Sequence, residues 1–94
     1  MSKKATILDE ATKLTSVERQ KTYGHPRENF SNIAEAWSAY LHARGLLARD
    51  VWLAPRDVSQ FNVLQKSMRQ GFLPKRDNLL DQAGYARTEE MLSE

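Results

Sequence analysis

Apolar residues recur every three or four positions along most of this chain, which is the spacing of a buried face on an α-helix. No stretch alternates apolar and polar residues as a half-buried strand does, and no Asn-Gly or Asp-Gly pair marks a hairpin turn. The chain has 94 residues, enough for one small domain and too few for a second. We therefore predict a single all-α domain over residues 1–94.

Turn-forming and capping residues divide this pattern into four helices, which we expect to pack as a compact four-helix domain. The expected ranges are about Ser2–Leu14, Pro26–Arg44, Pro55–Gln70 and Asn78–Ser93, with a short helical piece after a cap at Thr15 or Ser16. Gly71 is expected to end the third helix and Asp77 to cap the fourth. The expected apolar stripes are Ile7, Leu8, Ala11 and Leu14; Phe30, Ile33, Ala34, Trp37 and Leu41; Val58, Phe61, Leu64 and Met68; and Leu80, Ala83, Ala86 and Leu92.

The chain contains no cysteine, which excludes disulfides, thiolate zinc sites and a cysteine nucleophile. A chain this small without cross-links needs a tightly packed core or a second subunit, so we expect a homodimer in a reducing, cytoplasmic setting. No apolar run approaches the ~20 residues that cross a bilayer, and no apolar stretch follows the basic start. We therefore expect neither a membrane partner nor a secretory signal.

Charge is distributed unevenly along the chain. The net charge is +2, but residues 49–76 carry six basic and two acidic residues, and residues 77–94 carry five acidic residues and one basic residue. The basic segment can attract an anion such as a phosphate, or it can pair with the acidic tail. A net charge of +2 argues against tight binding of nucleic acid.

The segment 19–26 combines Arg19, Lys21, Tyr23 and His25 directly before a predicted helix. The exposed N–H groups and the dipole of a helix N-terminus favour an anion. Arg19 or Lys21 can pair with a phosphate, and Tyr23 can stack on a base. The alternative is an ordinary turn in which Tyr23 packs on the core and His25 is exposed.

Two further groups of polar residues lie on predicted helix faces. Ser59, Asn62, Lys66 and Arg69 share one face without an acidic residue, which suits either a phosphate or the acidic last helix. Asn78, Asp81 and Tyr85 also share one face, and Asp77 and Asp81, one turn apart, can offer oxygen ligands to Mg²⁺. Alternatively, Asp77 is only a cap, Asp81 pairs with Lys66 or Arg69, and Tyr85 belongs to the core. Gly84, inside a helix, indicates close approach of a neighbouring helix or a ligand.

The connector between the second and third long helices is unusually apolar. Val51, Trp52 and Leu53 are too apolar to remain in water, so we expect them to cover the end of the bundle or to enter a contact between subunits or with a partner protein.

Several of these segments together resemble a known family. Tyr23-Gly24-His25-Pro26 followed by Asn29, and Lys75-Arg76-Asp77-Asn78 followed by Asp81 and Gly84-Tyr85, look like a family of small phage and prophage proteins with a domain of unknown function. That family is distantly similar to phage proteins associated with nucleotide modification and to all-α NTP pyrophosphohydrolases of the MazG type. The resemblance implies a nucleotide-handling, oligomeric helical domain that uses Mg²⁺. By position, the recurring polar residues of the family are Arg19, Tyr23, His25, Asn29, Asp57, Lys66, Arg69, Arg76, Asp77, Asn78, Asp81 and Tyr85.

The leading hypothesis is a phage-encoded protein that binds a nucleotide in the cytoplasm of the infected bacterium, with hydrolysis as an open possibility. The pyrophosphohydrolases hold Mg²⁺ with paired glutamates, whereas this chain has Gln60 and Gln65 on its middle helix. The main alternative is a phage protein that inhibits a host factor, such as a defence component, through Val51, Trp52 and Leu53. A third alternative is an oligomeric structural module in which the polar stripes form salt bridges between subunits.

Overall fold

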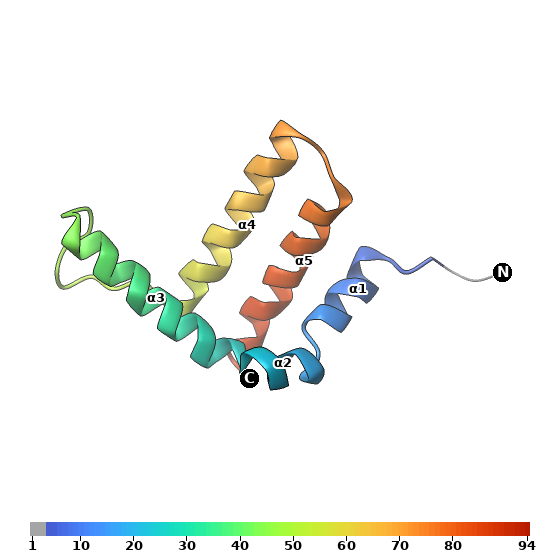
Figure 1. Ribbon diagram of the computed structural model, residues 1–94, viewed down its shortest axis with the longest axis horizontal. Helices are drawn as coiled ribbons and strands as arrows, with labels where there is room; N and C mark the ends of the chain where they lie inside the picture. Colours follow the sequence, from blue (N-terminus) through green and yellow to red (C-terminus); the bar gives the residue numbers. More distant parts are fainter. Residues whose placement is uncertain (1–3) are drawn as a thin grey trace.

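The computed structural model describes residues 4–94, except for the side chains of residues 17 and 18. These residues form α1 (Ile7–Leu14), α2 (Val17–Tyr23), α3 (Pro26–Ala43), α4 (Pro55–Phe72) and α5 (Arg76–Met91), and no strand is found among them (Figure 1). The all-α prediction is confirmed. The four long helices lie where the sequence predicted them, and the short helical piece is α2.

The helices form a flat layer rather than the compact bundle that we predicted. Helix α5 lies between α4 and α1, and α3 crosses the base of α4 and extends away from it (Figure 1). The radius of gyration is 15.3 Å and the principal dimensions are 57 × 33 × 19 Å. A compact domain of this length would have a radius of gyration of about 12 Å.

The N-cap side chain accepts a backbone hydrogen bond at the start of α1, at Thr6, and at the start of α3, at His25. Thr6 caps α1: its Oγ1 accepts from the Asp9 N–H at 3.1 Å. Its own N–H donates to the Asp9 carboxylate at 2.9 Å, and this bond lowers the pKa of Asp9. Three predicted boundaries are wrong. Gly71 lies inside α4, and the N-cap of α5 is Lys75, so Asp77 lies in the first turn of α5. The predicted start of the first helix, at about Ser2, lies outside the described residues, but residues 4–6 are described and are not helical, so α1 begins only at Ile7.

The hydrophobic core is small and lies where α3, α4 and α5 meet. Phe30, Ala34 and Val58 form its buried centre. The partly buried side chains of Ile33, Leu53, Tyr85 and Leu92 pack around it. Seven residues of the predicted stripes are exposed, so the prediction is wrong for them: Leu8, Leu14, Trp37, Phe61, Leu64, Met68 and Ala86.

Helix α4 turns its polar stripe, not its apolar stripe, toward α5. Lys66 Nζ lies 2.9 Å from an oxygen of Asp81, and the Gln60 side chain donates to Glu89 at 2.6 Å. The Lys66–Asp81 pair confirms, for Lys66, the alternative in which the polar stripe of α4 meets the acidic last helix. Arg69 of the same stripe is exposed. The geometry leaves most of the apolar stripe of α4 facing outward.

Two serines with no exposed surface provide a matched stability test. Ser38 Oγ donates to the Ala34 carbonyl at 2.7 Å and accepts from the Leu53 N–H at 2.8 Å, whereas Ser59 Oγ has no hydrogen-bond partner. We expect Ser38→Ala to lower the free energy of unfolding by about 1–3 kcal/mol, because it leaves the Leu53 N–H unsatisfied. Ser59→Ala should be neutral or stabilising, because it removes a buried hydroxyl that bonds to nothing. Urea unfolding curves followed by circular dichroism measure both changes, and equal losses would contradict the assignment.

Candidate functional site

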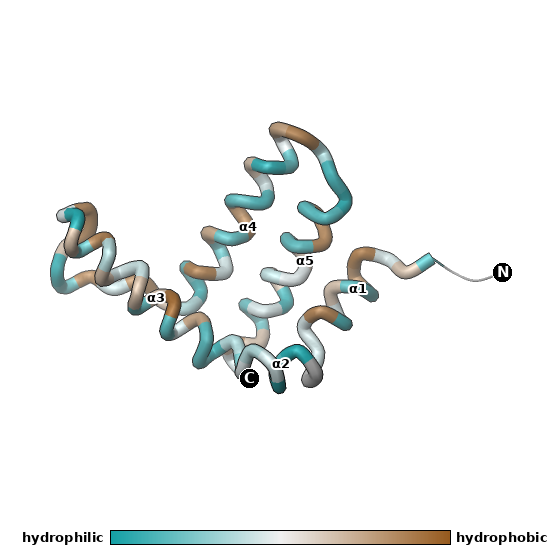
Figure 2. Tube along the Cα trace, viewed as in Figure 1, coloured by the Kyte–Doolittle hydropathy of each residue, from teal (hydrophilic) through white to brown (hydrophobic). Residues whose placement is uncertain are grey.

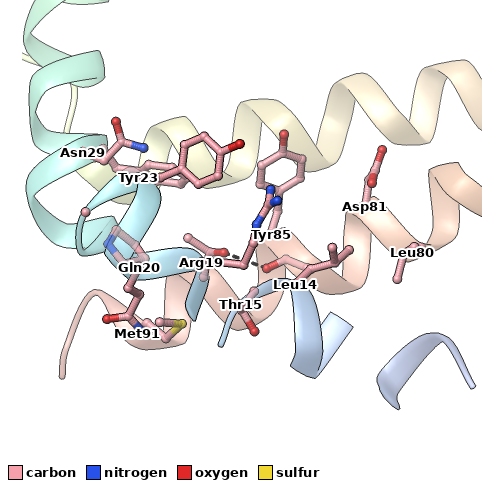
Figure 3. A pocket seen from close by; sticks show the side chains of 15 residues that line it. Leu14, Thr15, Arg19, Gln20, Tyr23, Asn29, Leu80, Asp81, Tyr85 and Met91 are labelled. Carbon is pink, nitrogen blue, oxygen red and sulfur yellow. Dashed lines mark hydrogen bonds between the residues drawn. The ribbon is translucent and has the colours of Figure 1, made fainter. Parts of the chain in front are cut away.

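A cavity of about 220 Å³ lies between α2, α3, α5 and the end of α1 (Figure 3). It gathers five of the residues that the sequence singled out: Arg19, Tyr23, Asn29, Asp81 and Tyr85. The remaining lining is largely apolar and comes from four elements. It is supplied by Leu14, Thr15, Gln20, Gly24, Pro26, Phe30, Leu80, Gly84, Thr88 and Met91. An apolar cavity with a few convergent polar groups is the usual form of a small-molecule site.

One side of the cavity is α2, which carries Arg19 and Tyr23 one turn apart. The Arg19 guanidinium carbon lies 4.6 Å from the centre of the Tyr23 ring, in a cation–π contact. None of the ion pairs formed by the described side chains involves Arg19. The arginine is therefore held over an aromatic ring while its charge stays available to an anion.

The turn that places α2 against α3 depends on Gly24. This residue has φ +82° and ψ 173°, a backbone conformation that is essentially restricted to glycine. His25 follows as the N-cap of α3, and its Nδ1 accepts from the Arg27 N–H at 3.0 Å. His25 therefore has a structural role here and does not line the cavity.

The opposite side of the cavity is α5, which carries Asp81, Gly84 and Tyr85. The charge of Asp81 is compensated by Lys66, and Tyr85 is half-buried against the core while it lines the cavity. The close approach of a neighbouring helix that we predicted at Gly84 is wrong, because a Cβ there would meet no atom within 4 Å. The alternative, close approach of a ligand, stays a prediction. Gly84 instead keeps open space beside the cavity.

Carboxamide groups add hydrogen-bonding capacity. Asn29 and Gln20 line the cavity, and their side chains make no hydrogen bond with any described residue. A carboxamide both donates and accepts, so it can pair with the edge of a heterocyclic base. Gln20 and the apolar lining residues were not predicted as site residues, because they come together only through the packing of separate helices.

The other predicted ligand-binding residues lie elsewhere. Arg69 and Asn78 line a separate hollow of about 450 Å³ at the turn between α4 and α5, where the Asn78 amide donates to Gln70 Oε1 at 3.2 Å. Arg76 pairs with Glu10 and so attaches α1 to α5, and this bond raises the pKa of the Arg76 guanidinium. The predicted ligand set is therefore divided between different places.

The described residues do not suit the Mg²⁺ site that the resemblance implies. Asp77 is exposed, and the Asp81 carboxylate is paired with Lys66. Within residues 4–94, apart from side chains 17 and 18, no three His, Asp or Glu side chains form a potential metal-binding group. Magnesium binding stays a prediction from the sequence, and we derive no step from it.

The connector predicted as a partner interface is ordered against α3. His42 Nε2 lies 2.8 Å from the Val51 carbonyl oxygen, and the His42 and Trp52 rings are perpendicular at 4.7 Å. Val51 and Trp52 are exposed, whereas Leu53 packs on the core. Two of these three residues are therefore accessible to a partner.

Comparison with known proteins identifies the family. Residues 6–93 match the model of a domain of unknown function, DUF6378. The chain belongs to this family. It is also 40% identical over 90 residues to the "Gene 55 protein" of Mycobacterium phage D29. That alignment covers 95% of this chain and 54% of the phage protein, so the chain spans about half the length of this relative. No solved structure matches.

The predicted phage family with a domain of unknown function is thereby confirmed. The family description names no ligand, so the likeness to MazG-type pyrophosphohydrolases stays an expectation. Among the described residues, no helix of this DUF6378 domain is both long and apolar enough to span a membrane.

Proposed function

We propose that this DUF6378 domain binds a nucleotide in the cavity between α2, α3 and α5. The observation that supports the proposal is the gathering of Arg19, two tyrosine rings and the Asn29 carboxamide around one cavity. A nucleotide combines an aromatic base, polar base edges and an anionic phosphate, and each of these finds a matching group there.

The size and exposure of the site indicate how the ligand would lie. Sites for drug-sized ligands have volumes of roughly 300–1,000 Å³. A cavity of about 220 Å³ therefore takes the base and part of the sugar. Arg19 is exposed, so the phosphate would lie at the mouth and pair with its guanidinium. Tyr85 is half-buried between cavity and core, and in this proposal its ring would stack on the base.

Binding is a better match to the described residues than hydrolysis. A water-activating base or a set of carboxylates would be needed at the phosphate. Asp81 is the only carboxylate in the described lining of the cavity, and it is neutralised by Lys66. We therefore propose a binding or sequestering protein and assign no catalytic residue.

The test uses the full chain and a mixed pool of nucleoside mono-, di- and triphosphates, including deoxy and cyclic forms. Retained and converted species are quantified by mass spectrometry. We expect one class to be retained unchanged. Arg19→Ala should weaken its binding about tenfold or more, because a hydrogen bond to a charged group is worth about 1.5–3 kcal/mol. Gly84→Leu should abolish binding, because the added side chain fills the cavity.

Trp52→Ala is the matched control, because Trp52 is an exposed aromatic residue that does not line the cavity. This variant should bind the nucleotide as well as the unmodified chain does. Circular dichroism checks that each variant remains helical. Failure to retain any nucleotide, or unchanged binding by Gly84→Leu, would overturn the proposal.

The same variants address the second candidate function, inhibition of a host protein. The exposure of Val51 and Trp52 supports this alternative. Under it, Trp52→Ala should remove the inhibition, whereas Gly84→Leu should preserve it.

A further inference from the structure

A continuous apolar stripe runs along the outside of α4. We define the α4 stripe as Phe61, Leu64, Met68 and Phe72, whose spacing of three or four residues places them on one helix face. Their exposed fractions are 45%, 58%, 76% and 92%. The stripe is therefore largely exposed to solvent. Figure 2 shows brown, hydrophobic segments recurring along α4.

The chain has no described segment left to cover this stripe. The other side of α4 is already occupied by α5, through the Lys66–Asp81 ion pair and the Gln60–Glu89 hydrogen bond. Helix α3 reaches only one end of the stripe, where the Trp37 and Phe61 rings stack with their centres 6.0 Å apart. Rotating α4 to bury the stripe would break its polar contacts with α5.

The total exposed surface shows how much is left uncovered. The chain exposes 7061 Å². A folded monomer of 10.8 kDa is expected to expose about 5,500 Å². The excess of about 1,500 Å² belongs to the whole flat molecule, of which the α4 stripe is one part. It is larger than the ~800 Å² that each partner buries in a standard protein–protein interface.

We propose that the α4 stripe is the interface of a homodimer, in which it packs against the same stripe of a second copy. A two-fold axis lets one helix face serve both partners, and a stripe made of four apolar side chains is complementary to itself. The small core also favours a second copy over another protein. A chain that buries so little apolar surface needs the α4 stripe to be buried whenever the chain is folded. A second copy of the same chain is always available to bury it.

Sedimentation equilibrium of the full chain over a wide range of concentrations tests the proposal. We expect the unmodified chain to approach twice the chain mass of 10.8 kDa. Met68→Glu and Leu64→Glu should each return the mass to that of one chain, because a pair of opposed carboxylates cannot be buried without large cost. Leu8→Glu is the matched control: Leu8 on α1 is 73% exposed, close to the 76% of Met68, and lies off the stripe. This variant should remain a dimer.

Thiol labelling of single-cysteine variants tests the same dimer interface if the glutamate variants fail to fold. The chain has no cysteine, so Met68→Cys and Leu8→Cys each introduce a single thiol. We expect the thiol of Met68→Cys to react with a maleimide several-fold more slowly than that of Leu8→Cys at high protein concentration, and equally fast after dilution. A chain that is monomeric at every concentration, a dimer that survives both glutamate variants, or equal labelling at high concentration would overturn the proposal.

The dimer and the nucleotide site are tested separately. No residue of the α4 stripe lines the cavity between α2, α3 and α5. Loss of the dimer in Met68→Glu therefore does not by itself remove a ligand contact, and failure of nucleotide binding leaves the dimer proposal unaffected.

Discussion

Replacing Phe30 with alanine is expected to lower the free energy of unfolding by about 3–5 kcal/mol. Phe30 is buried in α3 at the centre of the small core, with Val58 of α4 and Tyr85 of α5 in the same cluster. Few other large side chains are buried in the described part of the chain, so the neighbours cannot close the space that the ring leaves. Since small domains have marginal stability, a loss of this size leaves a large fraction of the chain unfolded at equilibrium.

Urea unfolding followed by circular dichroism measures this effect. Tyr40→Ala is the matched control, because Tyr40 is an aromatic residue on the same helix but exposed. Its cost should stay below about 1 kcal/mol. If Phe30→Ala costs no more than Tyr40→Ala, the core does not lie where α3, α4 and α5 meet.

Gly24→Val is expected to destabilise the chain by about 1–3 kcal/mol and to impair nucleotide binding. A Cβ at Gly24 would meet no atom within 4 Å, so the cost comes from the backbone at φ +82° and not from a clash. A β-branched residue is an outlier in this conformation. If the turn relaxes to avoid the strain, Arg19 and Tyr23 on α2 move away from Asn29 on α3.

Gly84→Ala is the control for this prediction. Gly84 also has open space around a Cβ, but it lies inside α5. Alanine is favoured over glycine in a helix by up to about 1 kcal/mol, so this variant should be more stable than the unmodified chain. Thermal unfolding of both variants measures the two stability changes, which should be a loss for Gly24→Val and a gain for Gly84→Ala. A loss of stability in Gly84→Ala, or no loss in Gly24→Val, would contradict the explanation.

The helices could be predicted from the sequence because apolar spacing and capping residues are local signals. For the orientation of α4, the sequence left two alternatives open. The apolar stripe of α4 has the spacing of a core face, which predicts that Leu64 and Met68 are buried. The spacing does not predict which helix or subunit packs against them. The pairing of Lys66 with Asp81 decides which side of α4 faces α5, and this depends on tertiary packing.

The candidate site was predictable in part for the same reason. Arg19, Tyr23 and Tyr85 stand out as polar or aromatic residues in unusual local patterns, and they do line one cavity. Arg76 and Asn78 have equally unusual patterns, yet they hold α1 and the turn between α4 and α5 in place. The apolar lining could not be recognised, since Phe30 and Met91 look like any core residues until the helices are assembled.

The shortness of α2 has a consequence for the kinetics of the site. Helices of fewer than about 12 residues are marginal unless tertiary contacts support them. Helix α2 has seven residues and no side-chain hydrogen bond at its cap, and Arg19 and Tyr23 are exposed. Its amide hydrogens should therefore exchange with solvent faster than those of α5, through local opening. A ligand that bridges Arg19 and Tyr85 would slow this exchange, and its apparent affinity would be set by the fraction of time that α2 is folded.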